Sequence, residues 1–326
     1  MRRRDFLGLL GGATLQPLAS HGQDTAKVPK IGLLLANSEE EEKQQGVGEA
    51  FLQGLSDLGY VVGKTVLVEP RFGADRDERA PTLAKELIDA QVDVIATASR
   101  GFYAAARLTQ TIPIVAAMAG DLVSLGLAES LARPGKNVTG TVVFTFEVAA
   151  KRLEVLRRIV PGLRRAGLLL LDGFPTNPQT LEALGAAAKA ADVSLQPFVV
   201  GGQKSYEAAF DAARDASIGG IVIGDPGQFY ADAKIIAAAA IARGLPTAGP
   251  GKTARDGILV GYGVDAVAAW RHAAAFVNKI LKGTKPGDIP IERASRFQII
   301  VNLKTAAALK LDIPADVLAA ADEVIE

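Results

Sequence analysis

Two glycine-rich segments in the last quarter of the sequence are the first candidates for chemistry, because both resemble phosphate-binding turns. Gly249-Pro250-Gly251-Lys252-Thr253 has the ending of a P-loop, but the glycine which that pattern requires five residues earlier is replaced by Pro246. Gly261-Tyr262-Gly263-Val264-Asp265-Ala266 matches the G-x-G-x-x-A pattern of dinucleotide sites. Tyr262 would crowd a pyrophosphate, and the acidic residue expected downstream is missing. An NAD(P)-dependent oxidoreductase that uses Gly261–Ala266 is therefore kept as the alternative function.

Few other residues could carry catalysis. The sequence has no cysteine and two histidines, His21 and His272, which excludes disulfides, thiolate ligands and a histidine-rich metal centre. A Ser-His-Asp triad would have to use His272, which lies within an expected surface helix. The 36 Lys and Arg residues balance the 36 Asp and Glu residues, which argues against a nucleic-acid partner. The sequence predicts no enzymatic activity, no cofactor and no metal.

The elements that must position any site alternate regularly along the chain. Apolar runs separated by segments of helical periodicity are typical of parallel sheets covered on both faces. The expected strands are 30–37, 65–71, 92–99, 114–119, 138–144, 167–172, 195–200, 220–224, 246–248, 258–261 and 297–301. The expected helices are 46–58, 78–89, 102–108, 124–131, 147–160, 178–191, 206–215, 229–242 and 266–281, the last of them ended by Gly283. The series begins again near residue 147, which predicts an α/β fold of two doubly wound parallel-sheet lobes.

The carboxylate run at 39–42 follows the first expected strand. It is interpreted as a solvated charge run or the start of a helix, and not as a metal site.

The first 22 residues have the pattern of an export signal. Arg2, Arg3 and Arg4 precede an apolar run at 6–19, which is shorter than the roughly 20 residues that a membrane-spanning helix needs. Arg3-Arg4-Asp5-Phe6-Leu7 fits the twin-arginine pattern, and Ser20 and Gly22 are the small residues that a signal peptidase reads. We expect cleavage near Gly22 and a periplasmic protein.

Candidate ligand-binding residues follow the expected strands. Ligands of open parallel sheets bind outside the carboxyl ends of the strands, where helix N-termini supply N–H donors. The polar and aromatic residues expected there are Ser38, Thr97, Ser99, Arg100, Asp121, Thr145, Phe146, Asn177, Asp225 and Tyr262. Small hydroxyls and a few carboxylates suit a small polar molecule. Helix capping is the alternative explanation for Ser38, Ser99 and Thr145.

Six segments, in order along nearly the whole chain, resemble one protein family. They are 1–12 (MRRRDFLGLLGG), 131–140 (LARPGKNVTG), 147–160 (EVAAKRLEVLRRIV), 261–265 (GYGVD), 276–286 (FVNKILKGTKP) and 299–326 (IIVNLKTAAALKLDIPADVLAAADEVIE). They resemble the ABC-transporter substrate-binding proteins, in particular the tryptophan/tyrosine-type binding proteins, which have the type I periplasmic binding protein fold.

This resemblance implies a receptor that binds a small molecule between two lobes and delivers it to an ABC permease, as a monomer and without catalysis. A sensory receptor of the same fold is left open. The resemblance, together with the strand pattern, implies three crossovers between the lobes, near 144–145, 264–265 and 293–295. Lobe one is then 28–143 plus 266–292, and lobe two is 144–265 plus 293–326. The lobes are expected to close on the ligand by hinge bending.

The loop after the third strand departs from the family pattern. Related proteins tend to have small residues where this chain has Arg100, Phe102 and Tyr103. A guanidinium at a helix N-terminus favours a carboxylate ligand. Asp121 corresponds to the family's recurrent Asp after the fourth strand and could, with Asp225, receive an ammonium group. A flat apolar wall could be formed by Phe102, Tyr103, Phe146 and Tyr262, the last of which lies in the family's Tyr-Gly-x-Asp segment. We therefore expect an amino acid or another small, aromatic carboxylate.

Overall fold

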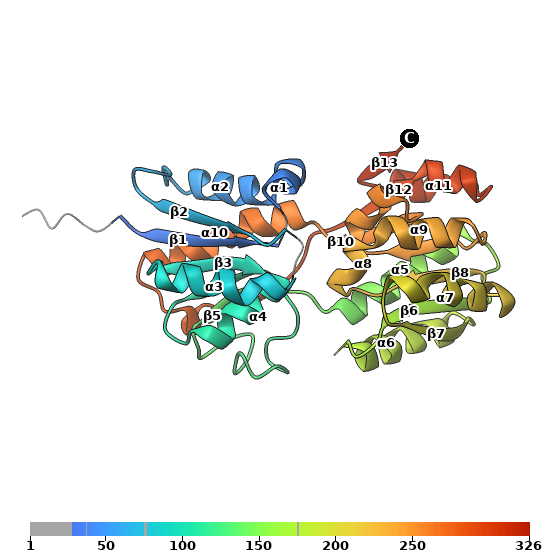
Figure 1. Ribbon diagram of the computed structural model, residues 1–326, viewed down its shortest axis with the longest axis horizontal. Helices are drawn as coiled ribbons and strands as arrows, with labels where there is room; N and C mark the ends of the chain where they lie inside the picture. The colour runs from blue at the N-terminus through green and yellow to red at the C-terminus, as the bar shows by residue number, and fades with distance from the viewer. Residues whose placement is uncertain (1–27, 37, 75–76, 175) are drawn as a thin grey trace, which may run out of the picture.

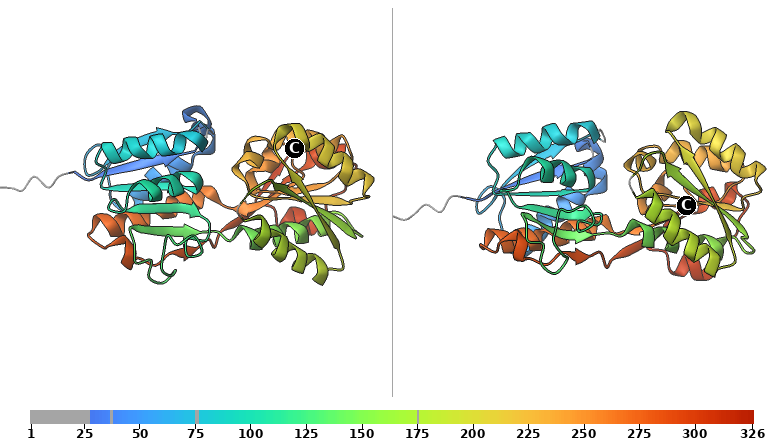
Figure 2. Two further views of the ribbon diagram at one scale, coloured as in Figure 1. Left: turned by 60° about the horizontal axis from the view of Figure 1, so that its bottom comes forward. Right: turned by 90° about the horizontal axis from the view of Figure 1, so that it is seen from below.

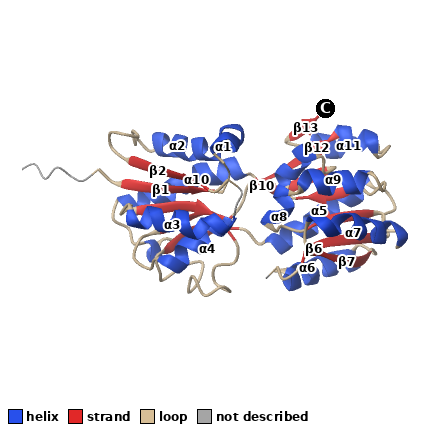
Figure 3. Ribbon diagram, viewed as in Figure 1, coloured by secondary structure: helices blue, strands red, loops and turns tan. Residues whose placement is uncertain are grey.

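Two sheets of mostly parallel strands, each covered by helices on both faces, lie side by side in the computed structural model (Figure 1, Figure 3). The structure describes residues 28–36, 38–74, 77–174 and 176–326. The expected export signal and its cleavage near Gly22 lie outside the described residues. The name lobe one is used for the part with the first sheet, and lobe two for the part with the second.

Lobe one has six parallel strands among its described residues, in the order β11-β5-β4-β3-β1-β2. Their bounds are β1 (Lys30–Leu35), β2 (Leu67–Phe72), β3 (Val94–Ala98), β4 (Ile114–Ala119), β5 (Val138–Val142) and β11 (Glu292–Arg293). The central strands are buried on both faces and are therefore almost wholly apolar. One face packs against α2 (Val47–Asp57) and α10 (Ala266–Leu281), and the other against α3 (Ala80–Asp89) and α4 (Ser99–Leu108).

Lobe two has seven strands within the described part of the chain, in the order β13-β12-β10-β9-β8-β6-β7. Their bounds are β6 (Arg165–Leu171), β7 (Ser194–Val200), β8 (Gly220–Ile223), β9 (Thr247–Gly249), β10 (Val260–Val264), β12 (Phe297–Asn302) and β13 (Glu323–Ile325). One face packs against α5 (Thr145–Ile159), α6 (Asn177–Ala190), α11 (Leu303–Ala308) and α12 (Ala315–Ala319). The other packs against α7 (Gln203–Asp215), α8 (Gly227–Ala231) and α9 (Ala233–Ile241).

The described chain passes between the sheets three times: from β5 to α5, from β10 to α10, and from β11 to β12. Figure 2 shows these segments bridging the two lobes. Backbone hydrogen bonds hold them to each other and to the sheets, because Asp265 N donates to Arg296 O and Ala294 N donates to Val142 O. The connections between the lobes are therefore thin and lie together.

Three expected elements differ from the structure. The prediction of a helix at 124–131 was wrong, and these residues form turns. The N–H groups of Leu127 and Ala128 both donate to Leu122 O, and Gly126 takes a left-handed φ of 66°, which a continuing helix cannot contain. The predicted lobes have parallel sheets, whereas in lobe two β12 runs antiparallel to β10 because the chain returns directly from lobe one.

The expected helix 229–242 is two helices, α8 and α9, divided at Asp232. The Asp232 carboxylate is buried and accepts hydrogen bonds from the Tyr206 hydroxyl at 2.6 Å and from Gln228 Nε2 at 2.7 Å. A carboxylate turned into the protein at this point interrupts the helix and joins it to α7.

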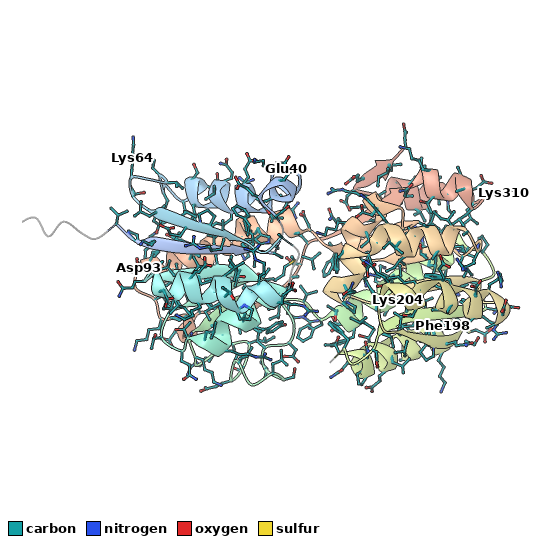
Figure 4. All side chains as sticks on the ribbon, in the orientation of Figure 1. Glu40, Lys64, Asp93, Phe198, Lys204 and Lys310 are labelled. Atoms are coloured by element: carbon teal, nitrogen blue, oxygen red, sulfur yellow. The ribbon has the colours of Figure 1, made fainter. Side chains whose placement is uncertain are left out.

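The carboxylate run at 39–42 begins a short helix, α1 (Glu39–Gln45), which is one of the alternatives that its sequence left open. Glu40 lies at the surface of lobe one (Figure 4). Its side chain is 78% exposed and pairs with Lys43. Glu42 is buried, and its carboxylate accepts a hydrogen bond from Gly48 N at the start of α2. The acidic run therefore ties together the first loop of lobe one and leaves part of its charge in solvent.

Candidate functional site

The carboxyl ends of the two sheets face each other. Strand β5 ends at the first crossing, and α5 leads away from that crossing into lobe two. Strands β6, β8 and β9 are parallel to one another and return toward lobe one (Figure 1). Loops that follow β1, β3 and β4 therefore lie opposite loops that follow β6, β8 and β9, which is where open α/β sheets bind ligands.

The β3–α4 loop puts Ser99 and Arg100 at the start of a ten-residue helix. Both residues are exposed, and Ser99 has a left-handed φ of 46°, a strained conformation of the kind that often occurs at binding sites. No side chain caps α4, so capping does not explain Ser99, and the first N–H groups of the helix keep the partial positive charge that attracts anions.

Thr97 has a different place from its neighbours. Its side chain is fully buried, and its hydroxyl donates to Leu34 O at 3.0 Å. The register of β3 against β4 shifts between Thr97 and Ala98, which turns the next residues toward the facing lobe. Thr97 therefore joins the end of β3 to β1 through its hydroxyl and is not exposed toward the facing lobe.

The loop after β4 carries Asp121. Its Oδ1 accepts hydrogen bonds from Val123 N at 3.0 Å and Ser124 N at 3.2 Å, so the carboxylate holds its own turn. Beside it, the Tyr103 hydroxyl accepts a hydrogen bond from Gly120 N at 2.8 Å. Burial is the main reason that the pKa of Tyr103 is raised, so the phenol is neutral and ties α4 to the end of β4.

On the lobe-two side, Asp225 forms a buried ion pair that the sequence analysis did not predict. Both of its carboxylate oxygens lie 2.7 Å from the guanidinium of Arg152, which is 1% exposed. Burial opposes the charge of Arg152, but Asp225 outweighs it, and the pKa of the guanidinium is raised. Asp225 was expected to receive an ammonium group of the ligand, but in this structure both of its carboxylate oxygens are bound by Arg152. The signal for Arg152 was a charged residue on the apolar face of α5, in line with Val148 and Leu156.

Tyr230 and Lys252 complete the surroundings of Asp225. The Tyr230 hydroxyl lies 3.5 Å from Asp225 Oδ1, and its pKa is raised mainly by burial, with the charge of Asp225 adding to the effect. Lys252 Nζ lies 5.7 Å from the centre of the Tyr230 ring, in the range of a cation–π contact. The lysine of the P-loop-like segment therefore follows β9 and faces an aromatic ring.

The glycines of both motifs serve backbone packing. A Cβ at Gly261 would collide with Gly251 O, and one at Gly263 would lie 2.9 Å from Gly251 N. The segment after Pro250 is a 3-10 helix (Gly251–Asp256), and the helix after β10 packs in lobe one. A dinucleotide turn needs its helix to pack on the sheet of the same strand, so this geometry does not form one.

A cavity of about 210 Å³ lies at the crossings. Tyr262 is the one expected site residue in its lining, where its ring stacks on Phe297 with 5.7 Å between centres. Arg293 Nη2 pairs with Glu147 at 2.6 Å, and the guanidinium lies 4.6 Å from the centre of the Phe144 ring. Sequence reasoning missed Arg293 and Phe297, because only the third crossing brings them beside α5 and β10.

Four further expected residues are dispersed. Thr145 and Phe146 begin α5, where Phe146 packs against Phe144 and no side chain caps the helix, so capping does not explain Thr145. Asn177 begins α6 and donates from Nδ2 to Leu171 O at 2.7 Å, which closes the loop after β6. Ser38 lines an open hollow of about 420 Å³ at the edge of lobe one. The expected residues thus lie on both facing edges and at the crossings.

Within the described ranges, no three His, Asp or Glu side chains gather as a metal ion would require. Among the helices of those same ranges, none is long and apolar enough to cross a membrane.

Comparisons with known proteins agree with this architecture. A family model described as ABC transporter substrate binding protein matches residues 36–325. The sequence is 23% identical over 292 residues to a tyrosine-binding protein of Clostridioides difficile (strain R20291), which covers 88% of this chain and 83% of that protein.

Two solved structures share the fold. An ABC domain from Streptococcus pneumonia in complex with L-Trp has a TM-score of 0.80 at 21% identity and covers 91% of this chain and 99% of its own. A solute binding protein of an ABC transporter from Rhodopseudomonas palustris BisB5, in complex with 3,4-dihydroxy benzoic acid, has a TM-score of 0.60 at 17% identity. The match covers 83% of this chain and 92% of that protein. At these identities the likeness shows the fold alone, and the predicted architecture of two mostly parallel α/β lobes is confirmed.

Proposed function

This chain belongs to the ABC transporter substrate binding protein family, and from that premise we propose that it is a periplasmic receptor for a small aromatic carboxylate. The receptor captures its ligand between the lobes and passes it to an ABC permease, without catalysis. The twin-arginine segment and the small residues Ser20 and Gly22 support export and cleavage. The Gly261–Ala266 motif, which offered the alternative of an oxidoreductase, has its glycines packed against the backbone of Gly251.

The observation that carries the proposal is the pairing of two facing sheet edges with complementary chemistry. Lobe one carries Arg100 at the uncapped start of α4, where a guanidinium and helix N–H groups suit a carboxylate. Lobe two carries Tyr230 and Lys252 after β8 and β9, and Tyr262 lies at the crossings. Tyrosine, L-Trp and 3,4-dihydroxy benzoic acid, which related proteins bind or are named for, each have an aromatic ring and a carboxyl group.

Mass spectrometry of the ligand that co-purifies with protein secreted to the periplasm, released by denaturation, tests this proposal directly. We expect an aromatic carboxylate or aromatic amino acid. Recovery of a dinucleotide instead, or quenching of protein fluorescence by NAD(P), would favour the oxidoreductase and contradict the receptor.

The proposal includes closure of the lobes, 28–143 plus 266–292 and 144–265 plus 293–326, about the three crossings. Thin connections that lie together are typical of hinges. Small-angle scattering of the protein with and without saturating ligand measures the radius of gyration, which we expect to fall on binding. An unchanged radius would argue against hinge closure and leave ligand capture intact.

A further inference from the structure

One buried guanidinium reaches three separate parts of the facing edge of lobe two. Besides its bidentate pair with Asp225, Arg152 donates from Nη1 to Ile223 O at 3.0 Å and from Nε to Tyr262 O at 2.9 Å. Ile223 ends β8 and Tyr262 lies in β10, while β9 lies between these two strands in the sheet. Arg152 therefore spans three adjacent strands from beneath.

The contacts use the fixed shape of the guanidinium. A planar fork with five N–H donors can bind a carboxylate with two bonds and still reach two carbonyl oxygens, whereas a lysine ammonium is a point charge that cannot. Because Arg152 is buried, separating it from Asp225 would leave an uncompensated charge in the protein interior, which is strongly destabilising. The position of Asp225, and of Tyr230 beside it, thus depends on Arg152.

The same side chain is tied to the crossings. Arg152 lies on α5, which begins at the first crossing, and its bond to Tyr262 O is three residues before the second crossing at Asp265. A shift of α5 relative to the sheet would therefore move the loop after β8 and the end of β10 together.

We propose that Arg152 is the positioning residue of the lobe-two half of the ligand site, and that Asp225 serves this framework by holding Arg152. This inference rests on the proposed function for its ligand readout, but its structural readout needs no ligand. Arg152 would act by keeping Asp225, Tyr230 and Tyr262 in register with lobe one, and not by touching the ligand itself.

Hydrogen exchange of the ligand-free protein, followed by mass spectrometry, tests the proposal with Arg152→Lys and the control Leu156→Ala. Leu156 is fully buried one turn further along the same face of α5 and packs near Gly220 at the start of β8, away from the facing edge. In Arg152→Lys we expect exchange at 224–231 and 260–265 to rise by about tenfold, because these segments open locally when their anchor is lost. In Leu156→Ala the same segments should exchange as in wild type, although the protein is less stable.

Equal exchange in wild type and Arg152→Lys, or equal acceleration in both variants, would overturn the positioning role. A second variant separates stability from position. Arg152→Met with Asp225→Leu replaces the pair by apolar side chains, an exchange that often preserves stability. It still removes the contacts to Ile223 O and Tyr262 O, so exchange at 224–231 and 260–265 should stay fast, and a return to wild-type rates would also overturn the proposal.

Calorimetry with L-tryptophan, L-tyrosine and 3,4-dihydroxybenzoate supplies the binding readout. For each of these that the wild type binds, Arg152→Lys should weaken the affinity by about tenfold, while Leu156→Ala should not. The reason is that the apparent affinity falls in proportion to the fraction of molecules whose lobe-two edge is in the binding arrangement. Unchanged affinity in Arg152→Lys would overturn the role in binding. A wild type that binds none of the three contradicts the proposed ligand class, and the exchange experiment then decides on Arg152 alone.

Discussion

Several polar side chains at the facing edges of the two sheets shape the loops that carry them. Thr97 and Asn177 donate to backbone carbonyls, and Asp225 is held by Arg152, so these three polar groups are used within the protein. Ser99 and Arg100 are exposed at the start of α4. A polar residue at the end of a strand therefore does not by itself mark a ligand contact, because a buried polar group there also satisfies the backbone.

Replacing Arg100 by Ala should weaken ligand binding by roughly 10- to 150-fold. The reason is that a hydrogen bond to a charged group contributes about 1.5–3 kcal/mol, and 1.4 kcal/mol corresponds to a factor of ten. Titration calorimetry with the co-purified ligand measures the change. Arg107→Ala, in the last turn of the same helix, is the matched control and should bind as wild type. If Arg100→Ala also binds as wild type, Arg100 does not anchor the carboxylate, while the receptor function stands.

Gly261→Ala should lower the free energy of unfolding by about 1–3 kcal/mol or more, the usual effect of forcing extra volume into a packed interior. The added methyl would collide with the backbone of Gly251, which cannot move as a flexible side chain can. Urea unfolding gives the free energy. Gly185→Ala is the control, because nothing lies within 4 Å of its Cβ position inside α6, and it should be neutral or stabilising. Equal stability of the two variants would show that β10 and the 3-10 helix at Gly251–Asp256 can move apart at little cost in free energy.

Among the helices, α10 joins the two lobes most directly. It starts at the second crossing, where Asp265 caps it by accepting a hydrogen bond from Ala268 N at 2.9 Å, and then packs against α2 in lobe one. A Cβ on Gly54 of α2 would collide with Arg271 O, so the two helices touch backbone to backbone. The cap therefore fixes where a chain leaving lobe two becomes part of lobe one.

Asp265→Ala should lower the free energy of unfolding by about 0.5–2 kcal/mol, because the first turn of α10 loses its acceptor. Asp265→Asn keeps an oxygen at that position and should lose much less. Thermal unfolding of both variants checks the difference. Comparable losses in the two would point to the charge of Asp265, and not to its cap, as the stabilising feature.

Across the whole molecule, burial has the same effect on every tyrosine in the sequence. The pKa of Tyr60, Tyr103, Tyr206, Tyr230 and Tyr262 is raised in each case, with loss of solvation as the main cause. The unfolded chain then loses these protons near its ordinary pKa of about 10, while the folded protein keeps them. The stabilisation is fully present below that pH and is lost as the pH rises toward the folded pKa values.

The free energy of unfolding should therefore fall as the pH is raised from about 9 to about 11, which urea unfolding followed by Trp270 fluorescence can measure. Tyr206→Phe removes one of the phenols that stay protonated, so its free energy should decline less steeply even though Asp232 loses a donor. A free energy that stays constant or rises over this range would contradict the raised pKa values.

Much of this architecture could be predicted from local patterns. The helix over Ala266–Leu281 and the strand over Ile114–Ala119 occur at the predicted bounds, because their apolar spacing and flanking residues are set by neighbours in the chain. Gly283 ends α10 with a φ of 95°, as its position predicted. The family, too, could be predicted from segments read in order along the chain.

What only the tertiary structure decided is which residues meet across long sequence distances. Three contacts join segments that are far apart in the sequence: Arg152 with Asp225, Arg293 with Glu147, and Gly251 with Gly261. The first and the third depend on the order of strands in the lobe-two sheet. The periodicity of apolar residues predicts which side chains face the interior, but it does not predict which residues they contact there. The sequence alone thus determined the alternation of strands and helices, while the folded sheets decided which charged residues pair across the facing edges.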